Sequence, residues 1–219
     1  MSEGSFWQAL RRSLGKIRRR LYESKELIHV ERSLESLRPR YTTHPTFGVR
    51  EVLSQEVLSR ECALPSGDRG VLLGAMAEGC RLFVLFNGEE WAGWMLVGRK
   101  YSYVNREFCY PIPSNHRHIV NLAIEIEPRY RKGKAAGFLK EAVMLRLKAE
   151  GFERVLGGIE ITNSSSLSLA RHFEFRQVRR VRVRKMLGLR WMTVLDSGQE
   201  APLPRLRTGV SRGGSLSKA

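Results

Sequence analysis

The stretch VNLAIEIEPRYRKGKAAGFL, residues 120–139, reads as a strand, a tight basic loop and the first turns of a helix. Leu122, Ile124 and Ile126 alternate with less apolar residues, which is the period of a strand. Pro128 ends this pattern, and beyond residue 133 the apolar residues follow helical spacing. The sequence therefore predicts a strand, loop and helix around which the rest of the chain is organised.

The loop in this stretch has the composition of an anion-binding site. The first amides of a helix have no acceptor within the helix and lie at the positive end of its dipole, so they can donate to phosphate oxygens. Small residues let a phosphate approach the backbone, and basic residues add charge. The loop carries both kinds: Gly133, Ala135, Ala136, Gly137, Arg131, Lys132 and Lys134. We expect a pyrophosphate site here, and the alternative is an ordinary strand-to-helix turn with solvated lysines.

The overall composition predicts a protein with one domain and a strongly positive field. Its 219 residues suffice for one sizeable core with extensions, and the net charge of +16 attracts phosphates, nucleic acid or anionic lipid. Cys62, Cys80 and Cys109 are scattered without metal-ligand spacing, which favours a reducing cytoplasm over a disulfide framework or a zinc site. No apolar run is long enough for a membrane span, and the start lacks the apolar block of a signal peptide.

Residues 1–40 are expected to form a basic, amphipathic, helical extension. Within residues 5–23, apolar and aromatic side chains share one helical face and arginines crowd the remainder. Such a helix suits peripheral contact with an anionic membrane, at the inner face of the cell membrane, or packing against its own domain or a second subunit as a homodimer. Residues 26–36 fit a strand or a continuing helix. Residues 197–219 are rich in Gly, Ser and Arg and are expected to be a flexible tail.

Residues 41–196 show a regular order of strands and helices. Asn87-Gly88 between two apolar runs predicts a β-hairpin of residues 81–86 and 91–97. A strand over 47–52 and two helical segments, the second near 71–78, precede it. The stretch 120–139 is followed by a strand over 154–161, a short helix capped by Asn163, and strands over 178–185 and 189–195. The element order therefore predicts an α/β domain that begins with antiparallel strands.

The loop and this element order resemble the GCN5-related N-acetyltransferase (GNAT) family, whose pyrophosphate loop reads roughly V-x-P-x-Y-R-G-K-G-x-G or A. Ile126, Pro128, Tyr130, Arg131 and Ala136 match that pattern in register, whereas Lys134 stands where the pattern has its first Gly. The resemblance covers about residues 41–196. It implies an α/β GNAT acyl-CoA N-acyltransferase fold, with a mixed, mostly antiparallel central sheet that is splayed between its fourth and fifth strands and flanked by helices.

The resemblance also implies an activity, the transfer of an acetyl or short acyl group from acetyl-CoA to a primary amine by direct attack. In the resembled fold a backbone amide of the splayed fourth strand binds the thioester carbonyl, which places this role at Ile124 to Ile126. The loop residues from Arg131 to Gly137 would hold the pyrophosphate, and Asn163 matches the family's asparagine after the fifth strand. The resemblance does not identify the amine acceptor, and an acceptor that also carries a negative charge is one alternative.

Acyl transfer needs a base for the amine and a proton donor for the leaving thiolate. Glu125 is the candidate base, directly or through water, and the alternative is an exposed strand carboxylate that pairs with an arginine. The tyrosine that many GNAT members use as a general acid falls at Ala170. Three candidates for the acid remain, namely His172, Tyr130 and water.

Other features of the sequence leave alternatives open. His116 and His118 form an H-x-H pair without a third spaced ligand, so we expect no metal. Arg180, Arg182 and Arg184 form a ladder that suits an anionic partner or pairs with acidic side chains such as Glu160, Glu174 or Asp196. The same fold could serve a non-catalytic acyl-CoA-binding or scaffold protein. The charge alone fits a protein that binds nucleic acid or an anionic membrane, but the absence of any nucleic-acid-binding signature argues against nucleic acid.

Overall fold

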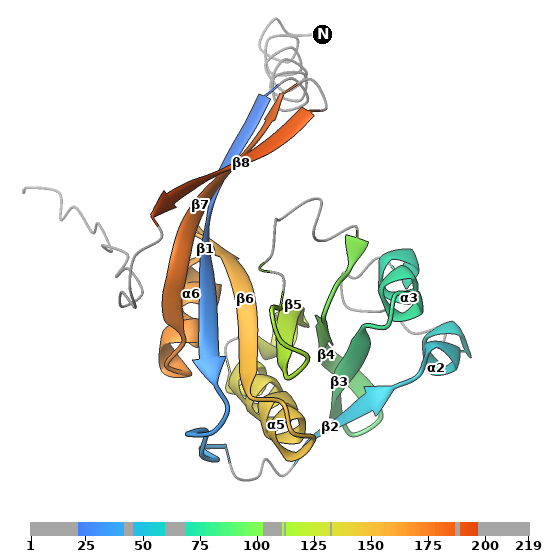
Figure 1. Cartoon of the computed structure of the whole chain (residues 1–219). Helices are drawn as coiled ribbons and strands as arrows, with labels where there is room; N and C mark the ends of the chain where they lie inside the picture. Colours follow the sequence, from blue (N-terminus) through green and yellow to red (C-terminus); the bar gives the residue numbers. More distant parts are fainter. Residues whose placement is uncertain are drawn as a thin grey trace, which may run out of the picture.

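The computed structural model describes residues 22–41, 46–59, 69–102, 111, 113–131, 133–186 and 189–196. Within these residues one eight-stranded sheet has the order β2-β3-β4-β5-β6-β1-β7-β8 (Figure 1). Its strands are β1 (Tyr22–Ser33), β2 (Phe47–Val52), β3 (Arg81–Asn87), β4 (Glu90–Gly98), β5 (His118–Ile126), β6 (Arg154–Glu160), β7 (Arg176–Met186) and β8 (Leu189–Asp196). Among these strands only β5 and β6 pair in parallel, so the sheet is mixed and mostly antiparallel, as the resemblance to the GNAT family implies.

Helices cover both faces of the sheet. The helices α5 (Ala135–Ala149) and α6 (Ser164–His172) pack on one face, where Leu139, Val143 and Leu167 join the larger core cluster. The short helices α2 (Ser54–Ser59) and α3 (Arg69–Ala77) lie on the other face, where Leu72 and Ala75 join a second cluster. The strands contribute to both clusters by alternation, because successive side chains point to opposite faces. A single 3-10 turn, η1 (Pro128–Tyr130), connects β5 to α5.

The Asn87-Gly88 hairpin is confirmed, with β3 ending at Asn87 and β4 beginning at Glu90. Gly88 has a φ of 61°, a conformation that L side chains rarely adopt and that glycine adopts without steric cost. The strand, loop and helix within residues 118–149 are also confirmed, as is the cap at Asn163, whose side chain accepts a hydrogen bond from the amide of Ser166 at 3.0 Å. Local sequence signals therefore account for the central elements.

The prediction that residues 1–40 form a helical extension is wrong for residues 22–33, where the strand that was one alternative for residues 26–36 is confirmed. Residues 22–33 form β1, which lies inside the sheet between β6 and β7. The reason is that β1 carries a run of consecutive buried residues, Leu27 to Val30, which suits a strand covered on both faces. Residues 1–21 and the predicted tail over 197–219 lie outside the described residues, so the amphipathic helix and the flexible tail stay predictions.

Arg180 and Arg182 of the arginine ladder in β7 pair with Glu26 of β1 rather than with the acidic residues named from the sequence. Glu26 receives hydrogen bonds from the Nε atoms of Arg180 and Arg182, each at 3.0 Å. Glu31 in the same strand pairs with Arg154 and Arg176, each at 2.8 Å. These charged contacts tie β1 into its place between β6 and β7.

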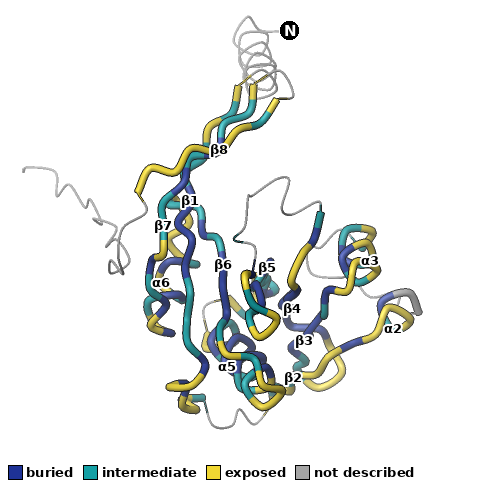
Figure 2. Tube along the Cα trace, viewed as in Figure 1, coloured by how far each residue is buried: buried dark blue, intermediate teal, exposed yellow. Residues whose placement is uncertain are grey.

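The ends of β1, β7 and β8 extend beyond the rest of the sheet (Figure 1). Figure 2 shows that this extension is exposed over much of its length. Its exposed large apolar side chains include Leu189, Trp191, Met192, Val194 and Leu195 of the edge strand β8. No helix among the described residues combines the length and the apolar character needed to cross a membrane.

Candidate functional site

The sheet opens between β5 and β6. These two strands pair only from His118 with Arg154 to Asn121 with Gly157, although β5 continues to Ile126 and β6 to Glu160. Beyond Asn121 the two strands part and leave a fork. On its other edge β5 pairs with β4, and the register shifts so that Leu122 is an extra residue between Ala123 and Asn121. This β-bulge lies at the point where the fork opens, and bulges of this kind often redirect backbone groups beside active sites.

The bulge is followed by a regular strand whose free edge faces the fork. The amide of Glu127 donates to the carbonyl of Ala92 in β4 at 2.9 Å. Because backbone amides alternate between the two edges of a strand, the amides of Ile124 and Ile126 point away from β4 and toward the fork. The Nε of Arg131 donates to the carbonyl of Ile126 at 2.7 Å, which agrees with this direction. The amide of Ile124 is therefore available to a ligand in the fork.

The N-terminus of α5 faces the same opening. The N-cap residue Lys134 makes no side-chain capping hydrogen bond, so the first amides of α5 are left for another acceptor. No acidic side chain lies in the first turn. Lys134 adds a positive charge next to these amides. This end of the helix has the backbone donors and the charge that a phosphate group requires.

A groove of about 770 Å³ connects the α5 N-terminus with the fork and with α6. It is lined by Tyr41, Ile124, Ile126, Arg131, Gly133, Lys134, Ala136, Gly137, Ser164, Ser165, Ser166, Ser168, Leu169, Arg171 and His172. The groove thus connects the N-terminus of α5, which suits a phosphate group, with the edge of β5, where the amide of Ile124 faces the fork. Its lining includes residues of α6 from the first residue of the helix, Ser164, to the last, His172.

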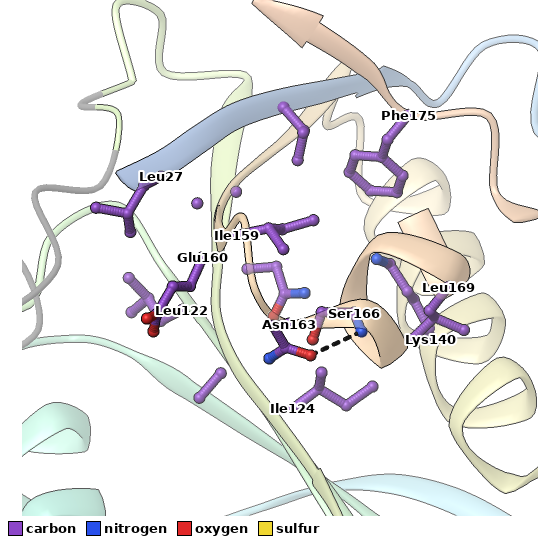
Figure 3. A pocket seen from close by; sticks show the side chains of 15 residues that line it. Leu27, Leu122, Ile124, Lys140, Ile159, Glu160, Asn163, Ser166, Leu169 and Phe175 are labelled. Atoms are coloured by element: carbon purple, nitrogen blue, oxygen red, sulfur yellow. Dashed lines mark hydrogen bonds between the residues drawn. The ribbon is translucent and has the colours of Figure 1, made fainter. Parts of the chain in front are cut away.

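A smaller cavity of about 270 Å³ lies inside the fork (Figure 3). It shares Ile124, Ser166 and Leu169 with the groove, so the two spaces adjoin. Figure 3 shows Lys140 and Leu169 on one side of the cavity and Leu27, Leu122 and Glu160 on the other. Asn121, Asn163 and Ser166 add polar groups to its wall.

Solved structures were compared with this chain, and the similarity lies in the fold. A GCN5-related N-acetyltransferase from Sphaerobacter thermophilus matches with a TM-score of 0.52 and 13% identity, over 80% of this chain and 56% of that chain. The chain has the GNAT fold. A Drosophila protein matches with a TM-score of 0.52 and 12% identity, over 82% of this chain and 57% of that one. The chain therefore spans little more than half the length of these two proteins.

Other comparisons add less. A Salmonella typhimurium protein solved with acetyl-CoA as its cofactor matches with a TM-score of 0.43 and 12% identity, over 65% of this chain and 94% of that chain. No family model and no curated protein matches the sequence. The GNAT fold is thus established by structure and by the order of its elements, including the splay that the resemblance implies.

Most residues predicted to bind the donor meet in one place within this GNAT fold. Ile124, Ile126, Arg131, Gly133, Lys134, Ala136 and Gly137 all line the groove. Ala135 is buried under the helix terminus, so only its backbone is available. Asn163 caps α6 and lines the inner cavity instead of the groove. Lys132 lies outside the described residues.

Glu125 lies beside the fork but lines neither space. Because side chains alternate along β5, Glu125 projects from the face opposite to Ile124 and Ile126, which contact the α5 side. Its carboxylate is about one-quarter exposed and lies 3.7 Å from the guanidinium of Arg131. Desolvation raises the pKa of Glu125, with Arg131 opposing the shift. A raised pKa on the far side of the fork suits a base that meets an acceptor there.

The other two predicted catalytic side chains are held away from the fork. The hydroxyl of Tyr130 accepts a hydrogen bond from Asn87 at 3.0 Å and donates to Glu90 at 3.3 Å, and Tyr130 lines neither the groove nor the cavity. His172 lies in the groove at the C-terminal end of α6, where its Nε2 is 2.9 Å from the hydroxyl of Tyr41. The structure does not bring these two side chains together with Glu125.

Sequence reasoning missed Tyr41, which crosses the groove. Glu141 of α5 is buried and accepts hydrogen bonds from the amides of Arg40 and Tyr41, both at 2.7 Å. These bonds hold the chain across the α5 and α6 pair and place the Tyr41 ring between Gly137 and His172. No local pattern marks residue 41, because its place depends on a contact with residues 100 positions away.

Sequence reasoning also missed Lys140, a buried cation. It is 4% exposed, and its Nζ lies 4.1 Å from the ring centroid of Phe175 and 5.8 Å from that of Phe173. Burial lowers the pKa of Lys140 to about 7. The sequence contains a signal for this burial, because Lys140 falls at helical spacing within an apolar stripe, formed by Ala136, Leu139, Val143 and Leu147. No group of three or more metal-ligating side chains occurs in the described part of the chain.

Proposed function

We propose that this protein is an acyl-CoA-dependent N-acyltransferase that transfers a short acyl group to a primary amine. The observation that carries the proposal is the continuity of the site. One groove runs from an uncapped helix N-terminus with small and basic residues to a strand edge whose free amides face a fork. A CoA thioester needs these features in this order: a pyrophosphate site, a channel for the pantetheine arm and a donor for the thioester carbonyl.

The donor would bind with its pyrophosphate on the first amides of α5 and its thioester at Ile124. Lys134 would contribute charge to the phosphate site, and the small side chains of Gly133 and Ala136 would allow close approach to the backbone. The pantetheine arm would follow the groove between β5 and α6. This placement uses the phosphate-binding role of a helix terminus at the place where the structure leaves its amides free.

Transfer would proceed by direct attack of the amine on the thioester carbonyl carbon. The carbonyl oxygen gains negative charge as the tetrahedral intermediate forms, and the amide of Ile124 would donate to it. The C–S bond then breaks and CoA leaves as a thiolate. The amine must lose a proton, and Glu125 would accept it from the face of β5 opposite to α5, directly or through water. Because Tyr130 is bonded to Asn87 and Glu90, and His172 is bonded to Tyr41 at the far end of α6, we assign water as the proton donor for the thiolate.

The position of Tyr130 also favours a second candidate, a non-catalytic protein that binds acyl-CoA. A binding protein needs the groove but no acid and no base, and the only carboxylate that we assign as base is paired with Arg131. Both candidates predict the same cofactor site. They differ in whether acyl-CoA is consumed.

Two measurements test the proposal. The first is the rate at which CoA thiol is released from acetyl-CoA in the presence of each of a panel of primary amines. The second is the melting temperature of the protein with and without free CoA. The proposed enzyme predicts both thermal stabilisation by CoA and amine-dependent thiol release above the rate without protein. Stabilisation without thiol release for any amine would leave only the binding protein. No stabilisation at millimolar CoA would contradict both candidates.

A further inference from the structure

The inner cavity offers more room than an acetyl group fills. It encloses about 270 Å³ and adjoins the groove at Ile124, where the proposed function places the thioester. A water molecule takes a share of about 30 Å³ in the liquid, and the methyl of an acetyl group is of similar size. An acyl group that starts at Ile124 could therefore extend by several more atoms before it meets the far wall.

The wall of the cavity carries an amine that has no carboxylate partner among the described residues. Nζ of Lys140 lies over the ring of Phe175 and farther from that of Phe173, and the side chain is 4% exposed. The neighbouring Glu141 makes no ion pair with Lys140 among the described residues, because adjacent residues of a helix do not face each other, and its carboxylate instead accepts from the backbone amides of Arg40 and Tyr41. A buried ammonium without a counter-ion is costly, so an anion that enters the cavity would be strongly favoured.

Two further polar groups line the same cavity. Asn121 has an Oδ1 that is buried and makes no hydrogen bond within the described part of the chain. Because the amide can present either its oxygen or its nitrogen to the cavity, it can donate to a carboxylate. Ser166 lines both the groove and the cavity and offers a hydroxyl. The cavity thus holds three groups that can donate to a carboxylate, and Glu160, the one carboxylate that lines it, lies on the wall opposite to Lys140 (Figure 3).

We propose that the donor of this enzyme carries an acyl group with a second, terminal carboxylate, of the succinyl type, and that Lys140 binds this carboxylate. The inference rests on the proposed function, because CoA must deliver the acyl group to Ile124. The donor is favoured over a free carboxylate because the cavity adjoins the CoA groove through three shared residues. The lowered pKa of Lys140 agrees with this role, since the empty cavity disfavours the charged amine and a bound carboxylate restores it.

The experiment compares the affinities of free CoA, acetyl-CoA, butyryl-CoA and succinyl-CoA by calorimetry. Butyryl and succinyl have equal numbers of carbons, so their comparison isolates the carboxylate. The wild-type protein should bind succinyl-CoA about 30-fold or more tightly than butyryl-CoA, the range for a buried charge-assisted contact. Lys140→Met keeps the length of the side chain and removes its charge, and it should abolish or reverse this preference.

Lys148→Met is the matched control. Lys148 lies two turns further along α5, lines neither space, and donates to the carbonyls of Glu35 and Leu37. Its substitution should leave the preference for succinyl-CoA intact even if it lowers stability. Should Lys140→Met fail to fold, Ser166→Ala replaces it and should reduce the preference by weakening succinyl-CoA alone.

Three outcomes decide the inference. Preference for succinyl-CoA in the wild type and in Lys148→Met, but not in Lys140→Met, supports it. Equal binding of butyryl-CoA and succinyl-CoA, or a preference that survives in Lys140→Met, overturns it while the proposed function stands. Failure of free CoA and of all three thioesters to bind overturns the proposed function and this inference together.

Discussion

Gly137 lies so close to the ring of Tyr41 that a Cβ on residue 137 would be 2.5 Å from Cζ and from the hydroxyl oxygen of Tyr41. The absence of a side chain at Gly137 therefore lets Tyr41 cross the groove. We predict that Gly137→Ala lowers the free energy of unfolding by about 1–3 kcal/mol, the usual cost of overpacking. Chemical denaturation of the two proteins measures this change.

A double-mutant cycle with Tyr41→Ala identifies the cause. If the ring is what residue 137 meets, Gly137→Ala should cost much less stability in the Tyr41→Ala background, where the space is empty. Additive effects of the two substitutions would show that Gly137 is required for another reason.

The contact of Glu26 with two arginines predicts an acid-sensitive sheet. Hydrogen bonds from Arg182 and Arg180 lower the pKa of Glu26 from its ordinary 4.5. A lowered pKa means that this stabilisation is complete above about pH 4.5 and is lost as the pH falls through the folded-state value. Glu26→Gln should cost about 1 kcal/mol at pH 7. The difference between the two proteins should shrink as the pH is lowered, and a difference that stays constant to the acid limit would contradict this assignment.

Burial of Lys140 predicts that the stability of the wild type also rises with pH in the neutral and alkaline range. The pKa of Lys140 falls from 10.5 to about 7 in the folded protein, so between these values the unfolded chain binds more protons and stability rises with pH. Lys140→Met should be more stable than the wild type by about 1–4 kcal/mol at pH 7 and below. Urea unfolding at a series of pH values should show this gain decreasing toward about pH 10. A gain independent of pH would mean that Lys140 does not lose its charge.

Glu125 as the base predicts a specific change in turnover. We expect Glu125→Gln to reduce kcat by about 100-fold, the lower range for loss of a general base, with little change in the KM for acetyl-CoA. The wild-type rate should rise with pH through the raised pKa of Glu125, and this rise should vanish in the variant. An unchanged pH profile in Glu125→Gln would remove Glu125 from the mechanism.

The sequence predicts those parts of the fold whose signals are local. The alternation in β5, the helical spacing of α5, the Asn87-Gly88 turn and the Asn163 cap each depend on neighbours within a few residues, and all are confirmed. Strand β1 is different, because its place between β6 and β7 depends on pairing with residues more than 100 positions away. The local pattern of residues 26–36 fits a strand or a continuing helix, and what decides for the strand is the pairing of Glu26 and Glu31 with arginines of the neighbouring strands.

The site was predicted to a similar extent. The phosphate loop and the Ile124 edge are contiguous in sequence, so one motif locates both. Tyr130 matches the motif, but Asn87 and Glu90 of the hairpin hold its hydroxyl, and no pattern within the loop reports that contact. The sequence shows Lys140 as one basic residue on an apolar stripe. It does not show that the side chain lines a cavity beside Phe175, because the fork and the cavity form only in the folded sheet.

The most direct measurement of the central claim is the calorimetric affinity of free CoA for the wild type and for Ala136→Asp. Ala136 lines the groove in the first turn of α5, where a carboxylate is favourable for the helix but repels a phosphate. Ala149→Asp is the control, because it makes the same change at the other end of the helix, away from the groove. We predict that Ala136→Asp folds with undiminished stability and loses at least about 30-fold in CoA affinity, while Ala149→Asp binds as the wild type does. Equal CoA binding by the wild type and Ala136→Asp would contradict the placement of the pyrophosphate on α5 and with it the proposed function of the groove.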